Sequence, residues 1–419
     1  MRSTHPLFAP ILLLAALSLG ACGILESPVA LMYTDVPEMA LYAAAFNISQ
    51  NRYKIHVSFE ENLPESLAKR KDKPSLAIGR YLKSAESRAQ FQSLDYLFTE
   101  LVINQSAFYP SLLELGNLDG RQVLLPVSFN LPLILFDTSR DKEIKDNFVI
   151  GIDEMQALSA SFNKSVKQSY TNMGFAPRWY PDFMYELLRL NNANFIEGSP
   201  LKWNKAGIDA GMAYLRSWST TLNGSALAED DFQFKYLYLP EHRSVQEGRI
   251  AFSYLNSSRY FAIPEERRAS LSFRWLAKDG AVPVADDPVF AGILRSSPAK
   301  SAAEAFLKWF FSEETQRALL EDARRYRSME SAFGLAGGFS SIRAVNEKSF
   351  PLYYPSLLGK MPPASYLKTV ASLPSVWPLM KSEVLLPLLL EATGSNPPQD
   401  IHAELEKRLT AWLMRRGKR

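Results

Sequence analysis

The stretch Gln122–Asp137, QVLLPVSFNLPLILFD, is the part of the sequence that best defines the fold. Two apolar runs with strand composition are separated there by the segment PVSFNLP. Proline lacks the N–H group that a strand interior needs, so two prolines around a polar centre suit a chain that leaves one sheet and enters another. We interpret this stretch as a crossover between two lobes.

Residues 281–292 form a second candidate crossover. Two apolar stretches are interrupted there by Pro283, by the adjacent carboxylates Asp286 and Asp287, and by Pro288. Two crossovers predict two lobes with a cleft between them, and the junction between domains is a favoured place for a ligand pocket.

The N-terminal part of the chain alternates between strand and helix patterns. Residues 30–34 are a short apolar run, residues 53–59 alternate between apolar and polar side chains, and residues 75–79 are again strand-like. After the first of these runs, Asp35-Val-Pro-Glu38 has the form of a helix start in which Asp35 is the N-cap. This alternation predicts a parallel α/β sheet.

One long amphipathic helix is predicted after the second crossover, over residues 301–320. Its apolar side chains recur at helical spacing. We expect this stripe to be core, and it consists of Ala302, Ala303, Phe306, Trp309 and Phe310.

The first 21 residues have the pattern of a signal peptide, with Arg2 at the start, an apolar middle and small residues at the end. Cys22, the only cysteine of the chain, follows directly. The segment Leu19-Gly20-Ala21-Cys22 resembles the lipobox of bacterial lipoproteins, which implies cleavage before Cys22 and attachment of lipid to its sulfur. The alternative is an ordinary signal peptide cut near Ala21.

Composition limits the class of protein. A single cysteine leaves no internal disulfide, so stability has to come from a hydrophobic core. A chain of 419 residues is longer than one core usually supports, which favours two or more domains. The formal net charge of +3 gives no support to nucleic acid as a partner. No later stretch is apolar enough to predict a membrane span, and we expect a monomer tethered outside the cytoplasm.

The common catalytic and metal-binding motifs are missing. The sequence has no G-x-S-x-G, H-E-x-x-H, Walker A or G-x-G-x-x-G pattern, and its four histidines are scattered. Glu60 and Glu61 are adjacent, but neighbouring side chains of a strand point to opposite faces, so adjacency does not make an acid–base pair. We therefore expect neither an enzyme nor a metal or cofactor.

Aromatic residues make up 12% of the chain, and several lie in polar, loop-like settings. An aromatic face can stack on the C–H surface of a sugar ring while nearby carboxylates and amides bind its hydroxyl groups. The alternative is ordinary packing. The stacking residues that we predict are Trp179, Tyr180, Tyr254 and Trp275, with Trp203, Tyr260 and Trp377 in similar settings.

Polar residues at strand ends and in the first crossover are the remaining candidates for ligand binding, because ligands of open α/β sheets bind beyond the carboxyl ends of strands. The predicted set is Tyr33, Asp35, Glu60, Ser128 and Asn130. We expect alanine at Trp179 or Trp275 to weaken ligand binding without unfolding the protein.

Several segments resemble the family 1 extracellular solute-binding proteins, relatives of the maltose-binding protein. The resemblance lies in LPVSFNLPLILFD (125–137), IDEMQALSASF (152–162), EGRIAFSYLNSS (247–258) and, most closely, SPAKSAAEAFLKWFFSEETQ (297–316). The chain departs from the family pattern at Asn256, where the family usually has glycine, and at Ser258, where it has an aromatic residue.

The resemblance implies a two-lobed periplasmic-binding-protein-like fold that closes on a solute by a hinge and delivers it to an ABC-type permease. We expect residues 24–127 with 290–340 to form the N-terminal lobe, and residues 128–289 with 341–419 the C-terminal lobe. The expected solute is a sugar or oligosaccharide, and the expected location is the bacterial cell envelope, held by the lipid anchor.

Three alternatives remain open at this point. The same fold could bind a polyamine, a phosphorylated compound or a peptide, and acidic residues at strand ends motivate the polyamine. The chain could be an exported glycoside-processing enzyme. It could also be a surface lipoprotein that binds another protein.

Overall fold

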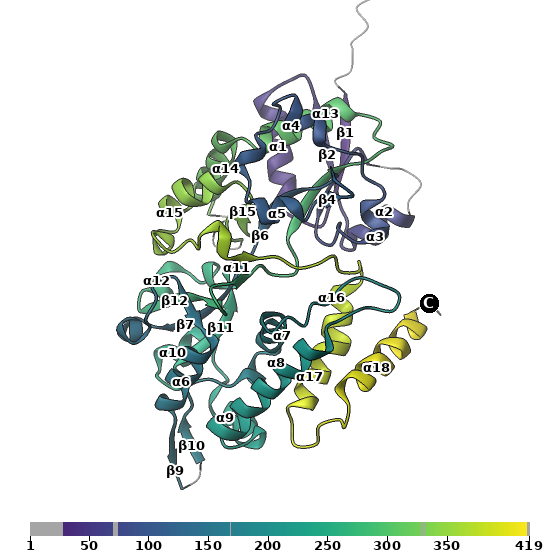
Figure 1. The fold of residues 1–419 in the computed structure, drawn as a ribbon. Helices are drawn as coiled ribbons and strands as arrows, with labels where there is room; N and C mark the ends of the chain where they lie inside the picture. The colour runs from purple at the N-terminus through teal and green to yellow at the C-terminus, as the bar shows by residue number, and fades with distance from the viewer. Residues whose placement is uncertain (1–27, 70–73, 168, 328, 330–331, 417–419) are drawn as a thin grey trace, which may run out of the picture.

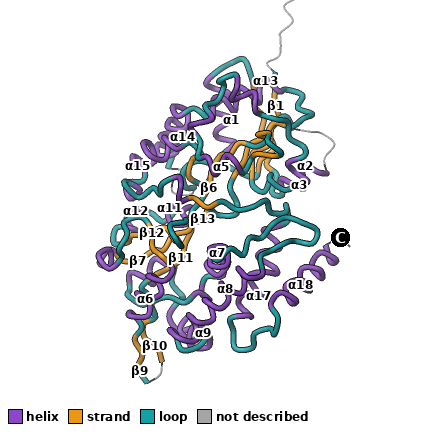
Figure 2. The backbone as a smooth tube through the Cα atoms, viewed as in Figure 1, coloured by secondary structure: helices purple, strands orange, loops and turns teal. Residues whose placement is uncertain are grey.

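The computed structural model describes residues 28–69, 74–167, 169–327, 329 and 332–416. Figure 1 shows two lobes, one above the other, with the C-terminal helices on the lower lobe. Figure 2 shows a group of strands in each lobe, with the hairpin of β9 (Lys164–Val166) and β10 (Ser169–Asn172) apart from them at the bottom of the view. The predicted signal peptide and Cys22 lie outside the described residues.

The N-terminal lobe is built on a six-stranded sheet. Its order is β15 (Phe339–Ser340), β6 (Leu125–Phe129), β14 (Val289–Ile293), β3 (Leu76–Gly79), β1 (Val29–Thr34) and β2 (Lys54–Phe59). Strand β1 runs parallel to β2 and β3, whereas β14 is antiparallel to both β3 and β6.

Helices cover both faces of this sheet. Successive residues of a strand point to opposite faces, and accordingly Met32 joins one buried cluster with α1 (Met39–Ser49) while Tyr33 joins another with α2 (Leu63–Lys69). The other elements of this lobe are α3 (Ala85–Arg88), α4 (Asp95–Thr99), α5 (Pro110–Glu114), the hairpin β4 (Asn117–Leu118) and β5 (Arg121–Gln122), α13 (Lys300–Phe310), α14 (Glu313–Arg325) and α15 (Phe350–Tyr353).

The C-terminal lobe has a four-stranded sheet and more helices. The sheet order is β11 (Phe252–Asn256), β7 (Pro132–Asp137), β12 (Leu271–Ala277) and β8 (Val149–Gly151). Helix α7 (Pro181–Leu190) packs on α8 (Lys205–Ser217) and on α17 (Leu386–Ala392). The remaining elements are α6 (Ile152–Phe162), β9 (Lys164–Val166), β10 (Ser169–Asn172), α9 (Ala226–Tyr236), α10 (Glu241–Gln246), α11 (Ser257–Phe261), α12 (Glu265–Arg268), α16 (Trp377–Met380) and α18 (Ile401–Arg416).

Both predicted crossovers are confirmed. The chain leaves the N-terminal sheet at β6 and enters the C-terminal sheet at β7 only three residues later. It returns from β12 to β14 through β13 (Val282–Pro283). The prolines lie closer to the strands than expected, because Pro126 is inside β6 and Pro132 begins β7.

A third crossing was missed in the sequence. Residues 345–353 pack against α14 of the N-terminal lobe. The rings of Phe350 and Tyr354 also contact Phe333, in the loop after α14. The chain then passes between the lobes through β16 (Leu367–Lys368), which pairs with β13, and reaches α16 on the other lobe (Figure 1). The first part of the segment 341–419 therefore packs with the N-terminal lobe.

Two local predictions were wrong. Helix α1 begins at Met39 after Glu38, and Asp35 does not cap it, because the Asp35 carboxylate instead accepts the backbone N–H of Arg80. The helix expected over 301–320 is two helices, α13 and α14. Ser312 separates them by capping α14, accepting a hydrogen bond from the backbone N–H of Thr315.

None of the helices within the described ranges is long and apolar enough to cross a membrane. The same part of the chain contains no group of three or more His, Cys, Asp or Glu side chains that could hold a metal ion.

Candidate functional site

A cavity of about 240 Å³ lies in the C-terminal lobe beside the start of α7, and we call it the aromatic pocket. The rings of Trp179, Tyr180 and Tyr254 line it, three of the four residues predicted to stack on a ligand. Charged groups also line it: Asp182, Glu241 and Arg259. Aromatic faces beside charged hydrogen-bonding groups are the arrangement that a polyhydroxylated ligand requires.

The three aromatic side chains are fixed by their neighbours. Tyr180 stacks on Phe175 with ring centroids 5.2 Å apart, and its hydroxyl donates to the Ser253 Oγ at 3.1 Å. Trp179 stacks on Phe232 at 5.4 Å. A binding surface built from rings with few rotamers loses little conformational entropy when a ligand arrives.

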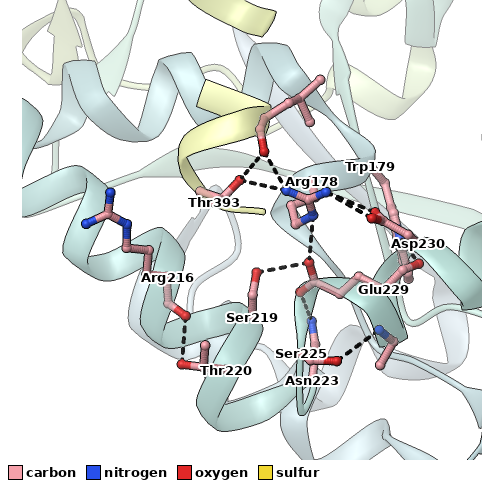
Figure 3. Close-up of polar contacts among 12 residues, drawn as sticks. Arg178, Trp179, Arg216, Ser219, Thr220, Asn223, Ser225, Glu229, Asp230 and Thr393 are labelled. Atoms are coloured by element: carbon pink, nitrogen blue, oxygen red, sulfur yellow. Dashed lines mark hydrogen bonds and ion pairs between the residues drawn. The ribbon is translucent and has the colours of Figure 1, made fainter. Parts of the chain in front are cut away.

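A buried polar cluster holds the turn that carries Trp179 (Figure 3). The Arg178 guanidinium donates to the Leu390 carbonyl at 2.7 Å and to both Asp230 carboxylate oxygens at 3.1 Å, and its Nε lies 3.6 Å from Glu229. The backbone carbonyl of Glu229 in turn accepts from the Trp179 indole at 3.1 Å. The cluster therefore ties the pocket wall to α17.

Glu229 is fully buried in this cluster, and its carboxylate accepts hydrogen bonds from Ser219 at 2.9 Å and Asn223 at 2.7 Å. Burial raises the pKa of Glu229 to about 7, although these two hydrogen bonds and Arg178 favour the charged form.

A second group of charges lies at the junction of the lobes, and we call it the interlobe acid cluster: Asp35, Asp286, Asp287 and Arg80. Strands β1 and β3 are parallel neighbours, so their carboxyl ends bring Asp35 and Arg80 together. The backbone N–H of Arg80 lies 3.2 Å from both Asp35 carboxylate oxygens, and its side chain reaches Asp287 at 3.8 Å.

A chain of charged contacts connects the interlobe acid cluster to the aromatic pocket. Buried Asp286 accepts from the Trp377 indole at 2.6 Å and from Lys381 at 3.1 Å. Lys381 also lies 3.7 Å from Asp182, which lines the pocket. Burial opposes ionisation of Asp286, but Lys381 and Arg189 outweigh it and lower its pKa.

Tyr81 also brings the two lobes together. It belongs to the N-terminal lobe but packs against the buried cluster of the C-terminal lobe. Its φ of 59° is uncommon for an aromatic residue, and strained backbone of this kind persists where the surrounding structure over-determines it.

The remaining predicted site residues lie elsewhere. Ser128 and Asn130 donate to the carbonyls of Ala336 and Gly337 at 2.9 and 3.0 Å, which joins the first crossover to the loop before β15. Tyr33 is part of the core, and buried Glu60 accepts from Ser58 at 2.8 Å and from Ser66 at 2.7 Å.

The stacking role predicted for Trp275 does not fit its position. Trp275 is completely buried in the middle of β12, between the rings of Phe273 and Phe339. Its indole N–H donates to the carbonyl of Lys360. Its neighbours in sequence looked loop-like, but it lies on a central strand, so it offers no face to a ligand.

Arg80 and Lys381 were missed as site residues. Arg80 follows directly after strand β3, the position that pointed to Asp35 after β1, so the same rule could have found it. Lys381 begins the short helical segment Lys381–Leu385, and only the fold places it beside Asp286.

We expect Asp35→Asn to make the protein more stable at neutral pH. Burial raises the pKa of Asp35 to about 6, against the opposing effect of Arg80. The protonated carboxyl group therefore stabilises the fold below about pH 4, and this stabilisation, about 3 kcal/mol, is lost as the pH rises through about 6.

Urea unfolding of the wild type and Asp35→Asn at about pH 4 and about pH 7.5 measures this difference. The variant should gain stability over the wild type only at the higher pH, whereas Glu61→Gln, on the exposed neighbouring loop, should differ little at either. A variant that is less stable at the higher pH would show that charged Asp35 stabilises the fold.

Solved structures confirm the architecture. MalE from the phytopathogen Xanthomonas citri, a sugar-binding protein, is similar with a TM-score of 0.64 at 11% identity, over 91% of this chain and 96% of that one. Maltose-bound MalE3 of T. maritima gives 0.60 at 14% identity, over 92% and 100%.

A substrate-binding protein of the ABC type from Listeria monocytogenes, in complex with cycloalternan, gives a TM-score of 0.60 at 13% identity, over 92% of this chain and 98% of that one. No protein-family model matches the chain, and no curated protein matches it in sequence.

The chain thus has the two-lobed α/β fold that is also found in substrate-binding proteins of ABC type. Within that class its fold is similar to MalE-like sugar-binding proteins over nearly the whole chain.

Proposed function

We propose that this protein is an extracytoplasmic solute-binding protein that captures a sugar or oligosaccharide for an ABC-type importer. The observation that carries the proposal is the aromatic pocket, in which Trp179, Tyr180 and Tyr254 stand beside Asp182, Glu241 and Arg259. Three structural neighbours support the same class of solute: one is a sugar-binding protein, one is bound to maltose and one is in complex with cycloalternan.

In this proposal the aromatic rings of the pocket provide the stacking surface, and the charged side chains beside them provide the hydrogen bonds. Tyr180 and Tyr254 contact the C–H face of a sugar ring, and Asp182 and Glu241 accept from its hydroxyl groups. When the lobes close, Asp35 and Arg80 of the N-terminal lobe contact the same ligand. These two side chains already pair with each other, and the ligand adds further hydrogen bonds to both.

Lobe closure follows from the three crossings. Within the described residues, the lobes are joined by residues 130–131, by the segment from β12 to β14 and by the segment that contains β16, so a few backbone torsions absorb the motion. The protein is held at the membrane by lipid on Cys22, and residues 1–21 are its signal peptide; the permease is its protein partner and the monomer its working form.

Thermal unfolding of a soluble form that begins after Cys22 tests this function against a panel of sugars, polyamines, phosphorylated compounds and peptides. A ligand that binds only the folded state stabilises it by about 2.7 kcal/mol at 100 times its dissociation constant. The expected result is a shift confined to one class of saccharide.

A shift with polyamines alone would favour the second candidate function, which the excess of carboxylates in the interlobe acid cluster motivates. Hydrolysis of a chromogenic glycoside by the protein, abolished by Asp182→Asn, would contradict a pure binding role. Binding of a membrane protein without any solute would favour a surface lipoprotein.

A further inference from the structure

A small second cavity lies behind the crossing segments, apart from the aromatic pocket. Pro283 of β13 and Lys368 of β16 line one side, and Tyr185, Arg189 and Asn194 line the other. We call it the crossing pocket. None of its lining residues belongs to the aromatic pocket, so whatever it binds is independent of the proposed sugar site.

Positive charge converges on this pocket. Lys368 donates to the Asn192 amide oxygen at 2.7 Å, and Lys278 donates to the Asn191 amide oxygen at 2.6 Å. Lys83, from the other lobe, donates to the Val370 carbonyl at 3.1 Å, and Val370 lines the pocket. Each ammonium group therefore has a neutral oxygen as its acceptor.

The carboxylates that act on Arg189 are already paired. Glu186 accepts two hydrogen bonds from Arg189, the shorter at 2.7 Å, and Asp286 is held by Lys381 and by the Trp377 indole. In the described part of the chain, none of Lys83, Lys278 and Lys368 forms an ion pair with a carboxylate. Their charges are left without a counter-ion.

The pKa values of two of these lysines are lowered by burial and by neighbouring positive charges. The pKa of Lys83 is lowered to about 7, first by burial and then by the charges of Arg189 and Arg88. Burial lowers the pKa of Lys368 as well, followed by the charges of Arg189 and Lys278. A bound anion would relieve this repulsion, because an opposite charge within a few ångströms favours the ammonium form.

The size of the crossing pocket limits the ligand. Its volume of about 30 Å³ is several times smaller than that of the aromatic pocket. A cavity needs roughly 10–15 Å³ to hold one water molecule, so there is room for a group of few atoms and not for a sugar ring. Lysine and arginine are the residues that bind phosphate-like oxyanions most readily.

We propose that the crossing pocket is an anion site that takes one oxyanion of phosphate size, bound by Lys368 and supported by the positive charges of Lys278 and Lys83; Arg189, which lines the pocket, is held by Glu186 and by the Val284 carbonyl. The pocket lies where β13 and β16 pair, on two of the three crossings. The anion therefore neutralises the crossing segments at the point where the lobes are joined.

Calorimetric titration of the soluble form with inorganic phosphate at low ionic strength and about pH 7.5 tests the site, since salt screens charged contacts. The expected result is one bound phosphate, with affinity reduced on the order of tenfold or more in Lys368→Gln and in Lys278→Gln. A hexose phosphate in a parallel titration distinguishes a free anion from one carried by a solute.

Lys308→Gln is the matched control, because it removes the same charge from an exposed position on α13 of the other lobe. Repetition in buffers of different ionisation enthalpy should show proton uptake on binding, which comes from lysines of lowered pKa. The proposal is overturned if neither phosphate compound binds, if the two glutamine variants bind as the wild type does, or if Lys308→Gln weakens binding equally.

Discussion

Trp275→Ala should destabilise the protein by about 3–5 kcal/mol, the usual range for truncation of a buried tryptophan. Trp275 is fully buried, its ring contacts Phe273 at 4.9 Å and Phe339 at 5.7 Å, and its indole N–H satisfies the Lys360 carbonyl. Alanine would leave both a cavity and an unsatisfied buried carbonyl. Because Phe339 belongs to the N-terminal lobe, the damage reaches the junction of the lobes.

Urea unfolding of Trp275→Ala and Trp275→Phe measures this effect, and phenylalanine should recover part of the loss by filling the cavity. Phe234→Ala is the matched control, because that ring is 88% exposed on α9 and its removal should change stability little. If Trp275→Ala has normal stability but binds sugar more weakly, Trp275 contributes to the ligand site and not to the core.

Arg178→Met should cost about 3 kcal/mol at alkaline pH, because it leaves the buried Glu229 carboxylate without its cation. The pKa of Glu229, about 7 in the wild type, rises when Arg178 no longer lowers it. A raised carboxyl pKa gives stability that is lost as the pH rises, so the penalty should grow from about pH 6 to about pH 8.

The double variant with Glu229→Gln should recover much of this loss, because a neutral amide needs no counter-ion. Arg216→Met is the control within the same region, where Figure 3 labels Arg216. Arg216 is exposed and donates to the Ala392 carbonyl, and it forms no ion pair within the described residues. A penalty for Arg178→Met that is equal at both pH values and unaffected by Glu229→Gln would show that the ion pair is not what the arginine provides.

Local sequence patterns predicted the architecture well. The crossover in residues 122–137 and the strand at 30–34 were found because apolar runs broken by proline have few other interpretations. The third crossing was missed because residues 345–376 contain only short elements, and their place depends on packing of Phe350 against Phe333.

The candidate site was predicted only in part. Trp179 and Tyr180 are adjacent in sequence just before α7, and Tyr254 of β11 lies with them at the aromatic pocket. Trp275 could not be distinguished from these residues in the sequence. Its complete burial in β12 removes it from the set of stacking residues. Ion pairs such as that of Lys381 with Asp286, which are nearly a hundred residues apart in sequence, cannot be found without the fold.

The central claim is that a saccharide binds at the aromatic pocket. Its most direct test is calorimetric titration of the wild type and Tyr180→Ala with the saccharide that shifts the unfolding temperature. We expect one saturable site in the wild type and, in a folded Tyr180→Ala, an affinity weakened on the order of tenfold, since aromatic stacking contributes about 0.5–1.5 kcal/mol beyond the area it buries. Undiminished affinity in Tyr180→Ala, or no saccharide bound by the wild type, would contradict it.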